Sequence, residues 1–176
     1  AKRPTIAFAM GQRGLVSRIL TGKFGGFLTF GSLQAGAESA PGQLTAEELR
    51  TLYRYPELGP DTTLYGVIAK PVAHSMSPAI MNASFARLGV DACYVPMLVD
   101  DAPGTVEAFR ALEFAGYSVT IPHKQTVMEA LDEVDQLARD IGAVNTIVRR
   151  PDGSLWGTNT DCAAAVRSIE AAQSVL

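Results

Sequence analysis

The sequence predicts an α/β protein in two parts, and three observations support this. Short apolar runs typical of buried strands alternate with segments that have helical apolar spacing, which indicates strands covered by helices. A stretch rich in proline and glycine, residues 55–61, interrupts this alternation near the first third of the chain. A Pro-Asp-Gly turn at residues 151–153 indicates a hairpin, so the second part should contain a mixed sheet.

The proline-rich stretch coincides with a change in charge. Residues 1–63 hold seven Lys and Arg against five Asp and Glu, whereas the remainder holds eight against thirteen. Two prolines and a glycine so close together cannot lie inside a helix or a central strand. We therefore expect one domain over residues 1–55, a linker over 56–63 and a second domain over 64–172.

The first part has a βαβα pattern. Strands are predicted at residues 5–10 and 27–30, and a helix at 15–20. Thr45 and Glu48 form a capping-box signature, which predicts a helix over 46–54. Buried strands in this order pair in parallel, and two such units cannot cover both faces of their strands. The first part therefore has the pattern of a piece of a larger α/β layer.

The second part begins with a strand, a helix and another strand. We predict strands at 64–69 and 92–98 and a helix between them. Ser77 and Pro78 suit the N-cap and first position of that helix, and Gly89 suits its end. Asp100 and Asp101 can cap the helix that follows the second strand.

The remainder of the second part contains the stretch Gly116-Tyr-Ser-Val-Thr-Ile-Pro-His-Lys124. A strand at 117–121 should end at Pro122, and helical spacing predicts a helix over 123–131. A second helix should end near Gly142. Strands at 144–148 and 155–157 should flank the hairpin turn, and a final helix should begin near residue 162.

Composition excludes several classes of function. The net charge is −3 and Lys and Arg form no long cluster, which argues against nucleic-acid binding. No apolar run reaches the roughly twenty residues that span a bilayer. Cys93 and Cys162 are far apart, and His74 and His123 lack metal-ligand spacing, so we expect a reducing compartment, no disulfide and no metal. The chain begins at Ala1 without a signal-peptide pattern, which leaves the compartment open.

Polar side chains of the second part fall at strand ends and helix starts, where open α/β folds build their sites. Lys124 could anchor an anion, act as an acid or base, or form a Schiff base, but it could also be a solvated helix residue. Ser75 and Ser77 could bind a carboxylate at a helix N-terminus, or serve only as caps. Asp161 could exchange a proton with Lys124 or cap a helix. Thr120 and Asn145 lie near them in the same pattern.

Three residue motifs in the first part point to a known family. Met-Gly-x-x-Gly-x-x-Ser-Arg at residues 10–18, Phe-Gly-Gly-x-Leu-Thr-Phe-Gly at 24–31 and Ser-Ala-Pro-Gly-Gln at 39–43 resemble the C-terminal end of type I 3-dehydroquinate dehydratase. That family is a (β/α)₈ barrel, so residues 1–55 would be its last two βα units. The resemblance implies that Arg18, Ser39 and Gln43 are a remnant of the dehydratase substrate site. The family's Schiff-base lysine and acid/base histidine have no counterpart in this stretch.

The motifs of the second part resemble the substrate-binding domain of shikimate dehydrogenase over residues 64–172. They are Tyr-Gly-Val-Ile-Ala-Lys-Pro-Val-x-His-Ser-x-Ser-Pro, Val-Thr-Ile-Pro-His-Lys, Gly-Ala-Val-Asn-Thr and Gly-x-Asn-Thr-Asp, in this order. The two resemblances together are those of a plant-type bifunctional 3-dehydroquinate dehydratase/shikimate dehydrogenase. The chain differs from many members at Ser118 and Cys162, and Ser118 leaves quinate as a competing substrate.

The second resemblance implies roles for the candidate residues. Ser75 and Ser77 would bind the substrate carboxylate, and Thr120, Asn145 and Asp161 the ring hydroxyls, with Lys124 also contacting the substrate. Lys124 and Asp161 would be the catalytic pair.

The implied reaction is reversible reduction of 3-dehydroshikimate to shikimate with NADPH in aromatic amino acid biosynthesis, in a plastid if the source is a plant or alga and otherwise in the cytoplasm. The alternatives are a quinate or quinate/shikimate dehydrogenase and a non-catalytic fragment that binds a small acid.

The cofactor is expected to bind elsewhere than in these residues. The family's NADP domain is a Rossmann fold with a glycine-rich phosphate loop, and no Gly-x-Gly occurs anywhere in this sequence. We therefore expect the chain to hold the substrate site without a cofactor-binding residue. The sequence gives no indication of the oligomeric state.

Overall fold

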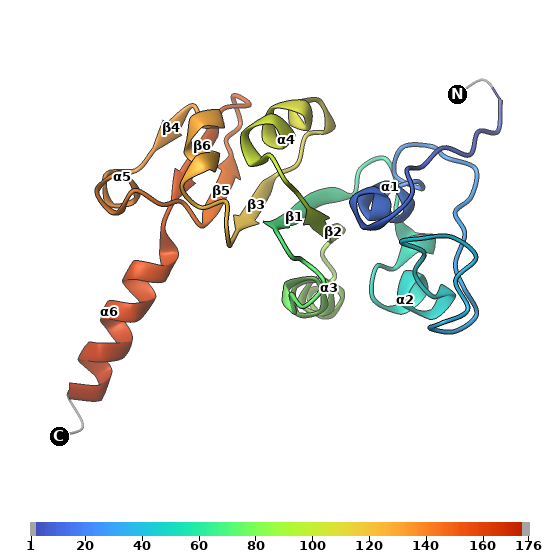
Figure 1. The fold of residues 1–176 in the computed structure, drawn as a ribbon, viewed down its shortest axis with the longest axis horizontal. Coiled ribbons are helices and arrows are strands. Elements are labelled where there is room, and N and C mark those ends of the chain that lie inside the picture. The colour runs from blue at the N-terminus through green and yellow to red at the C-terminus, as the bar shows by residue number, and fades with distance from the viewer. Residues whose placement is uncertain (1–2, 174–176) are drawn as a thin grey trace. The chain divides into compact units, whose positions relative to one another are not determined.

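The computed structural model describes residues 3–173 (Figure 1). The chain forms two compact units, Ala1–Asp100 and Asp101–Leu176. Both units combine helices with strands, so the predicted α/β class is confirmed. None of the helices in the described residues is long and apolar enough to span a membrane. Within residues 3–173 no group of three His, Cys, Asp or Glu is arranged to hold a metal ion.

The first segment of unit 1 is helical where helices were predicted but forms no regular strand. It contains η1 (Gln12–Gly14), α1 (Leu15–Ile19) and α2 (Ala46–Thr51). Residues 5–10 and 27–30 form no strand and have no ladder of hydrogen bonds, so the two strands predicted there are wrong. Between them the Phe27 N–H donates to the Thr5 carbonyl at 2.8 Å. A strand is defined by its paired neighbours, and one such bond does not make a sheet.

The capping box of α2 is confirmed. The Thr45 hydroxyl accepts the Glu48 N–H at 3.1 Å, and the Glu48 carboxylate accepts the Thr45 N–H at 2.8 Å. The helix ends at Thr51, three residues before the predicted end. Arg54 then adopts a left-handed conformation with φ of 49°, and the proline-rich stretch begins with the 3₁₀ helix η2 (Tyr55–Glu57).

The second segment of unit 1 is a parallel βαβ unit, as predicted. It consists of β1 (Thr63–Ala69), α3 (Ser77–Leu88) and β2 (Ala92–Leu98). Gly89 closes α3 in the left-handed conformation. The prediction that Ser77 is the N-cap is wrong by one position, because Met76 is the cap and Ser77 is the first helical residue.

The outer edge of β2 is closed by side chains. In β2 the backbone N–H and C=O groups of every second residue face β1. Those of Ala92, Tyr94 and Pro96, which lie between, face away from it. Asn82 of α3 takes the place of a strand neighbour, since its side chain accepts the Tyr94 N–H and donates to the Tyr94 carbonyl, both at 2.8 Å. Arg54 donates to the Ala92 carbonyl at 3.0 Å, and Pro96 has no N–H. Such blocking prevents another chain from pairing with the edge.

Unit 2 is a mixed sheet with helices, and its strand order is β3-β5-β6-β4. β5 is antiparallel to both β3 and β6, while β4 is parallel to β6. The predicted hairpin is therefore confirmed. The elements are α4 (Ala102–Ala108), η3 (Arg110–Leu112), β3 (Gly116–Val119), η4 (Thr126–Ala130), β4 (Glu133–Val134), α5 (Gln136–Ile141), β5 (Thr146–Arg149), β6 (Leu155–Thr158) and α6 (Thr160–Gln173).

One helix of unit 2 differs from its prediction. The helix expected over 123–131 is a 3₁₀ helix over Thr126–Ala130, preceded by turns. The apolar positions Val127, Met128 and Leu131 fit three residues per turn as well as 3.6, and so the spacing alone does not separate the two. Gly142, in the left-handed conformation, ends α5 as predicted.

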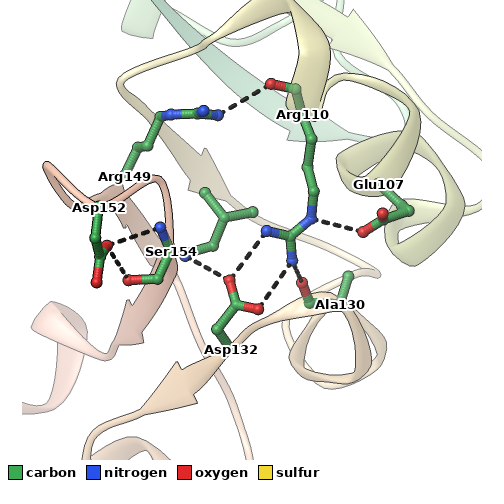
Figure 2. A network of polar contacts seen from close by, with 8 residues as sticks. Glu107, Arg110, Ala130, Asp132, Arg149, Asp152 and Ser154 are labelled. Atoms are coloured by element: carbon green, nitrogen blue, oxygen red, sulfur yellow. Dashed lines mark hydrogen bonds and ion pairs between the residues drawn. The ribbon is translucent and has the colours of Figure 1, made fainter.

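Arg110, the first residue of η3, ties the segment after η4 to the rest of unit 2 (Figure 2). Arg110 donates to both carboxylate oxygens of Asp132, at 3.0 and 3.4 Å, and to the Ala130 carbonyl at 3.0 Å. Asp132 in turn accepts the Leu155 N–H of β6 at 2.7 Å. These bonds lower the pKa of the Asp132 carboxyl, chiefly through the Leu155 N–H and then through Arg110. The network fixes the end of the segment that carries Lys124.

Candidate functional site

Lys124 lies in the turns that follow β3, and its backbone and side chain are both held. Its carbonyl accepts the Val144 N–H at 2.8 Å, which fixes the main chain at this point. Its side chain is 30% exposed, so the ammonium group remains accessible to a small molecule. β3 ends at Val119 before the proline at 122, so the chain turns here and Lys124 lies beyond the end of the strand.

Asp161 is the second residue of α6 and forms an ion pair with Lys124. Lys124 Nζ lies 2.5 Å from Asp161 Oδ2. The hydrogen bond from Lys124 lowers the pKa of the Asp161 carboxyl, partial burial opposes this, and a hydrogen bond from Asn145 adds to it. Asp161 is therefore a carboxylate at neutral pH. An ammonium and a carboxylate in direct contact can hold and exchange a proton at one point.

Asn145 lies beside this pair, just before β5. Its Oδ1 accepts the Thr160 N–H at 2.9 Å and the Thr146 hydroxyl at 2.9 Å. Its Nδ2 donates to the Thr160 hydroxyl at 3.0 Å. The carbonyl side of the amide is thus used to start α6. A primary amide carries two N–H donors, so its nitrogen side can donate both to Thr160 and to Asp161.

Thr120 belongs to the same turn as Lys124. Its carbonyl accepts the His123 N–H at 2.9 Å, and its side chain is half-buried. Unit 2 therefore positions four of the predicted residues on the segments that follow β3 and flank β5 and β6. It brings Lys124, Asn145 and Asp161 together directly.

Ser75 and Ser77 lie in unit 1, at the start of α3, and both are half-buried. The Ser75 hydroxyl accepts the Ser77 N–H at 3.3 Å, which satisfies one of the free donors of the helix. The capping side chain is thus Ser75 and not Ser77. Ser75 also lines a cavity of about 280 Å³ within unit 1, with Gln12, Glu48, Tyr53 and Pro78 among its walls. This volume lies near the lower end of ligand pockets, about 300 Å³.

The predicted dehydratase remnant also lies in unit 1. Gln43 Oε1 accepts both the N–H and the hydroxyl of Ser39, at 2.8 and 3.1 Å, so these two residues form one polar group. Arg18 is 2% exposed, and its guanidinium lies 4.3 Å from the centre of the Phe8 ring. Within the described residues its Nε and Nη2 have no hydrogen-bond partner. A buried cation of this kind is stabilised by an anion.

Sequence reasoning missed Thr160. Its hydroxyl lies 3.0 Å from Asn145 Nδ2 and 3.2 Å from Asn145 Oδ1, and its N–H is bound by the same amide. Its side chain is exposed next to Asp161. The signal was available, because Thr160 is the central residue of the Asn-Thr-Asp motif that supplied Asp161.

Comparison with known proteins matches two stretches of the chain to two different families. Residues 67–147 match the family described as "Shikimate dehydrogenase substrate binding domain", and residues 1–60 match "Type I 3-dehydroquinase". The chain is 51% identical over 171 residues, 97% of its length, to the chloroplastic bifunctional 3-dehydroquinate dehydratase/shikimate dehydrogenase of Arabidopsis thaliana. It covers 28% of that relative.

The chain is thus similar over nearly its whole length to a bifunctional 3-dehydroquinate dehydratase/shikimate dehydrogenase, and each family model matches one part of it.

Two further relatives match its dehydrogenase part. The shikimate dehydrogenase (NADP(+)) of Rubrobacter xylanophilus is 47% identical over 108 residues, which are 60% of this chain and 38% of that protein. A crystal structure of shikimate 5-dehydrogenase from Listeria monocytogenes, in complex with shikimate and NAD, has a TM-score of 0.58 at 38% identity. That match covers 64% of this chain and 39% of the Listeria chain. The chain thus spans about a quarter to two fifths of the length of the relatives that it matches.

Proposed function

We propose that this chain supplies the substrate site and the proton-transfer pair of an enzyme that reversibly reduces 3-dehydroshikimate to shikimate with NADPH. The observation that carries the proposal is the 2.5 Å contact between Lys124 and Asp161, with Asn145 beside it. The names of the relatives support the substrate and the cofactor. By its similarity to the bifunctional Arabidopsis relative, the full-length protein would also dehydrate 3-dehydroquinate.

In this proposal different polar side chains bind different groups of the substrate. Ser75 and Ser77, at the start of α3, bind the carboxylate, because helix N-termini favour anions. Thr120 and Asn145 contact ring hydroxyls. Asp161 accepts a hydroxyl hydrogen with the carboxylate oxygen that does not face Lys124.

Lys124 is the proposed proton donor in the reduction. The cofactor supplies a hydride to the carbonyl carbon when it is bound. As the C=O electron pair moves onto oxygen, the Lys124 ammonium gives that oxygen a proton, and in the oxidation the neutral amine takes it back. Asp161 stabilises the ammonium form, since an opposite charge in contact favours the charged state.

The residues of this chain do not supply the loop that binds a dinucleotide phosphate. That loop needs glycines two residues apart, and the sequence has none. The part of this chain in the reaction is therefore substrate binding and proton transfer.

The dehydratase remnant supports a binding role and no chemistry. Arg18 is a buried cation with free donors, and Ser39 and Gln43 form a polar group, which together suit a substrate carboxylate. Of the two lysines before the linker, Lys23 donates to the Pro60 carbonyl at 2.7 Å, and Lys2 lies outside the described residues. We propose that the Schiff-base lysine is provided by other parts of the barrel.

The choice between shikimate and quinate rests on Ser118, which lies half-buried in β3 two residues before Thr120. We propose shikimate as the main substrate and expect the full-length enzyme to turn over shikimate faster than quinate. A plastid location follows if the source is a plant or alga, because the Arabidopsis relative is chloroplastic.

The proposal is tested by Lys124→Ala in the full-length enzyme, with NADPH oxidation measured against 3-dehydroshikimate. We expect turnover to fall by about 10²–10⁴-fold with a smaller change in KM, because the proton transfer is lost. Lys23→Ala is the matched control and should retain turnover, since the Lys23 ammonium donates to the Pro60 carbonyl and has no part in the proposed site. Near-normal turnover of Lys124→Ala would refute the catalytic role of this lysine.

A further inference from the structure

The dipeptide Val144-Asn145 connects both members of the Lys124–Asp161 pair. On one side the Val144 N–H donates to the Lys124 carbonyl at 2.8 Å. On the other side Asn145 Oδ1 accepts the N–H of Thr160, the residue before Asp161, at 2.9 Å. A shift of this dipeptide would therefore move the two catalytic side chains relative to each other.

Two further backbone bonds hold the same dipeptide in the sheet. The Val119 N–H, at the end of β3, donates to the Asn145 carbonyl at 2.8 Å. The Asn145 N–H donates to the Thr158 carbonyl of β6 at 3.1 Å. The segments that lead to Lys124 and to Asp161 thus both pass through hydrogen bonds to these two residues.

Gly157 of β6 is the residue against which this dipeptide packs. A Cβ atom built on Gly157 would lie 3.0 Å from Val144 Cγ2 and 3.2 Å from Cγ1, closer than ordinary packing allows, and would collide with Leu131 Cδ1. Leu131 ends the segment that carries Lys124 and can rotate its side chain. Val144 is fully buried and branched at Cβ, so it has neither room nor an alternative rotamer.

The backbone of Gly157 does not itself require glycine. The residue lies in the centre of the sheet, paired with Ile147 of β5 and Val134 of β4, and its φ is outside the left-handed region. A glycine inside a strand weakens the strand, and it commonly marks a close approach of another group. Here that group is Val144.

We infer that Gly157 is a positioning residue for the proton-transfer pair, acting through its contact with Val144. The absence of a side chain lets Val144 lie close enough to bind the Lys124 carbonyl while Asn145 binds the start of α6. The catalytic role inferred for Gly157 rests on the proposed function. The contacts that support it all lie within this chain.

The test is Gly157→Ala, with Gly59→Ala as the matched control, because a Cβ at Gly59 meets no atom within 4 Å. In the purified chain, carbon NMR of the Asp161 carboxyl follows its titration and thus its contact with Lys124. We expect this titration to move toward that of a free aspartate in Gly157→Ala and to stay unchanged in Gly59→Ala. In the full-length enzyme we expect kcat to fall by about a hundredfold, the usual effect of a misplacement of about 1 Å, with little change in KM.

A compensating variant separates positioning from general damage. Gly157→Ala combined with Val144→Ala removes the Val144 methyl groups that the new methyl group would meet, while Leu131 can rotate away, so the Asp161 titration and kcat should recover in part. If Gly157→Ala does not fold, Val144→Ile adds bulk against the same glycine and should give the same split between kcat and KM.

The inference is overturned if Gly157→Ala leaves the Asp161 titration and kcat unchanged, or if the double variant is as impaired as the single one. Failure of the proposed function gives a different result. The wild-type full-length enzyme would then not reduce 3-dehydroshikimate, while the NMR experiment on the chain would still decide the role of Gly157.

Discussion

Residues 3–55 and residues 101–173 both carry predicted binding residues, but they hold them differently. In residues 101–173 the lysine, the asparagine and the aspartate bind one another, and their backbones lie in a hydrogen-bonded sheet. In residues 3–55 the segments before and after α1 form no ladder, and the guanidinium of Arg18 is buried with two unpaired nitrogens. Segments joined by one sheet thus bring the lysine and the aspartate into contact within this chain. The Arg18 guanidinium, by contrast, has donors that no described residue satisfies.

The exposed apolar side chains show the same contrast. Met10, Phe27 and Leu33 are 66%, 65% and 96% exposed, although each belongs to or adjoins a run that reads as a buried strand. By contrast, Val119, Ile147 and Leu155 of unit 2 are all at most 2% exposed. A strand-like sequence therefore indicates which apolar side chains would be buried in a sheet. Whether they are buried depends on the presence of neighbouring strands and helices.

Hydrogen exchange offers the largest expected difference between the two regions. Amides of residues 5–10 and 27–30 should exchange about a hundredfold or more faster than amides of β5, because they lack ladder bonds and open locally. Mass spectrometry or NMR on the purified chain measures this. Protection of residues 5–10 equal to that of β5 would remove the contrast.

Substitution of Arg18 sharpens the comparison through stability. Arg18→Met in this chain should raise the free energy of unfolding by about 1 kcal/mol, since removing two buried unpaired donors outweighs the loss of one cation–π contact. Urea unfolding checks the sign. Arg54→Met is the matched control and should destabilise, because its guanidinium binds the Ala92 carbonyl. A loss of stability in Arg18→Met would mean that the guanidinium is paired.

Titration of Asp161 gives the smallest expected effect. Its pKa should lie below the ordinary value of 3.8, and Lys124→Met should raise it by removing the largest cause of the shift. Because the folded-state pKa is lowered, any stability that the pair contributes is present above the ordinary pKa and is lost as the pH falls through the folded one. Carbon NMR of the carboxyl measures the shift. An unchanged pKa in Lys124→Met would contradict the contact.

The sequence alone was sufficient for most of unit 2 and for the contact between Lys124 and Asp161. The end of α5 at Gly142 follows from a local pattern, and the hairpin of β5 and β6 follows from its turn. The roles of the site residues remain predictions.

The features that the sequence did not predict depend on contacts between residues that are far apart in the chain. The strands predicted at 5–10 and 27–30 lack partners, and the segment after Lys124 winds as a 3₁₀ helix with the same apolar positions inside. The role of Thr160 depends on its hydrogen bond to Asn145, and the role of Gly157 depends on its packing against Val144. Neither contact can be read from the sequence. Contacts of this kind join residues that local periodicity treats separately.

The most direct measurement of the central claim is calorimetric titration of the purified chain with shikimate, for the wild type, Lys124→Ala and Asp161→Ala. Asp152→Ala is the matched control, because that carboxylate lies in the hairpin turn and binds Ser154. We expect saturable binding that Asp161→Ala weakens about tenfold or more, as the loss of a charged hydrogen bond requires, and that Asp152→Ala leaves unchanged. Equal affinity in the wild type and Asp161→Ala, with both chains folded, would contradict the placement of the substrate beside this pair.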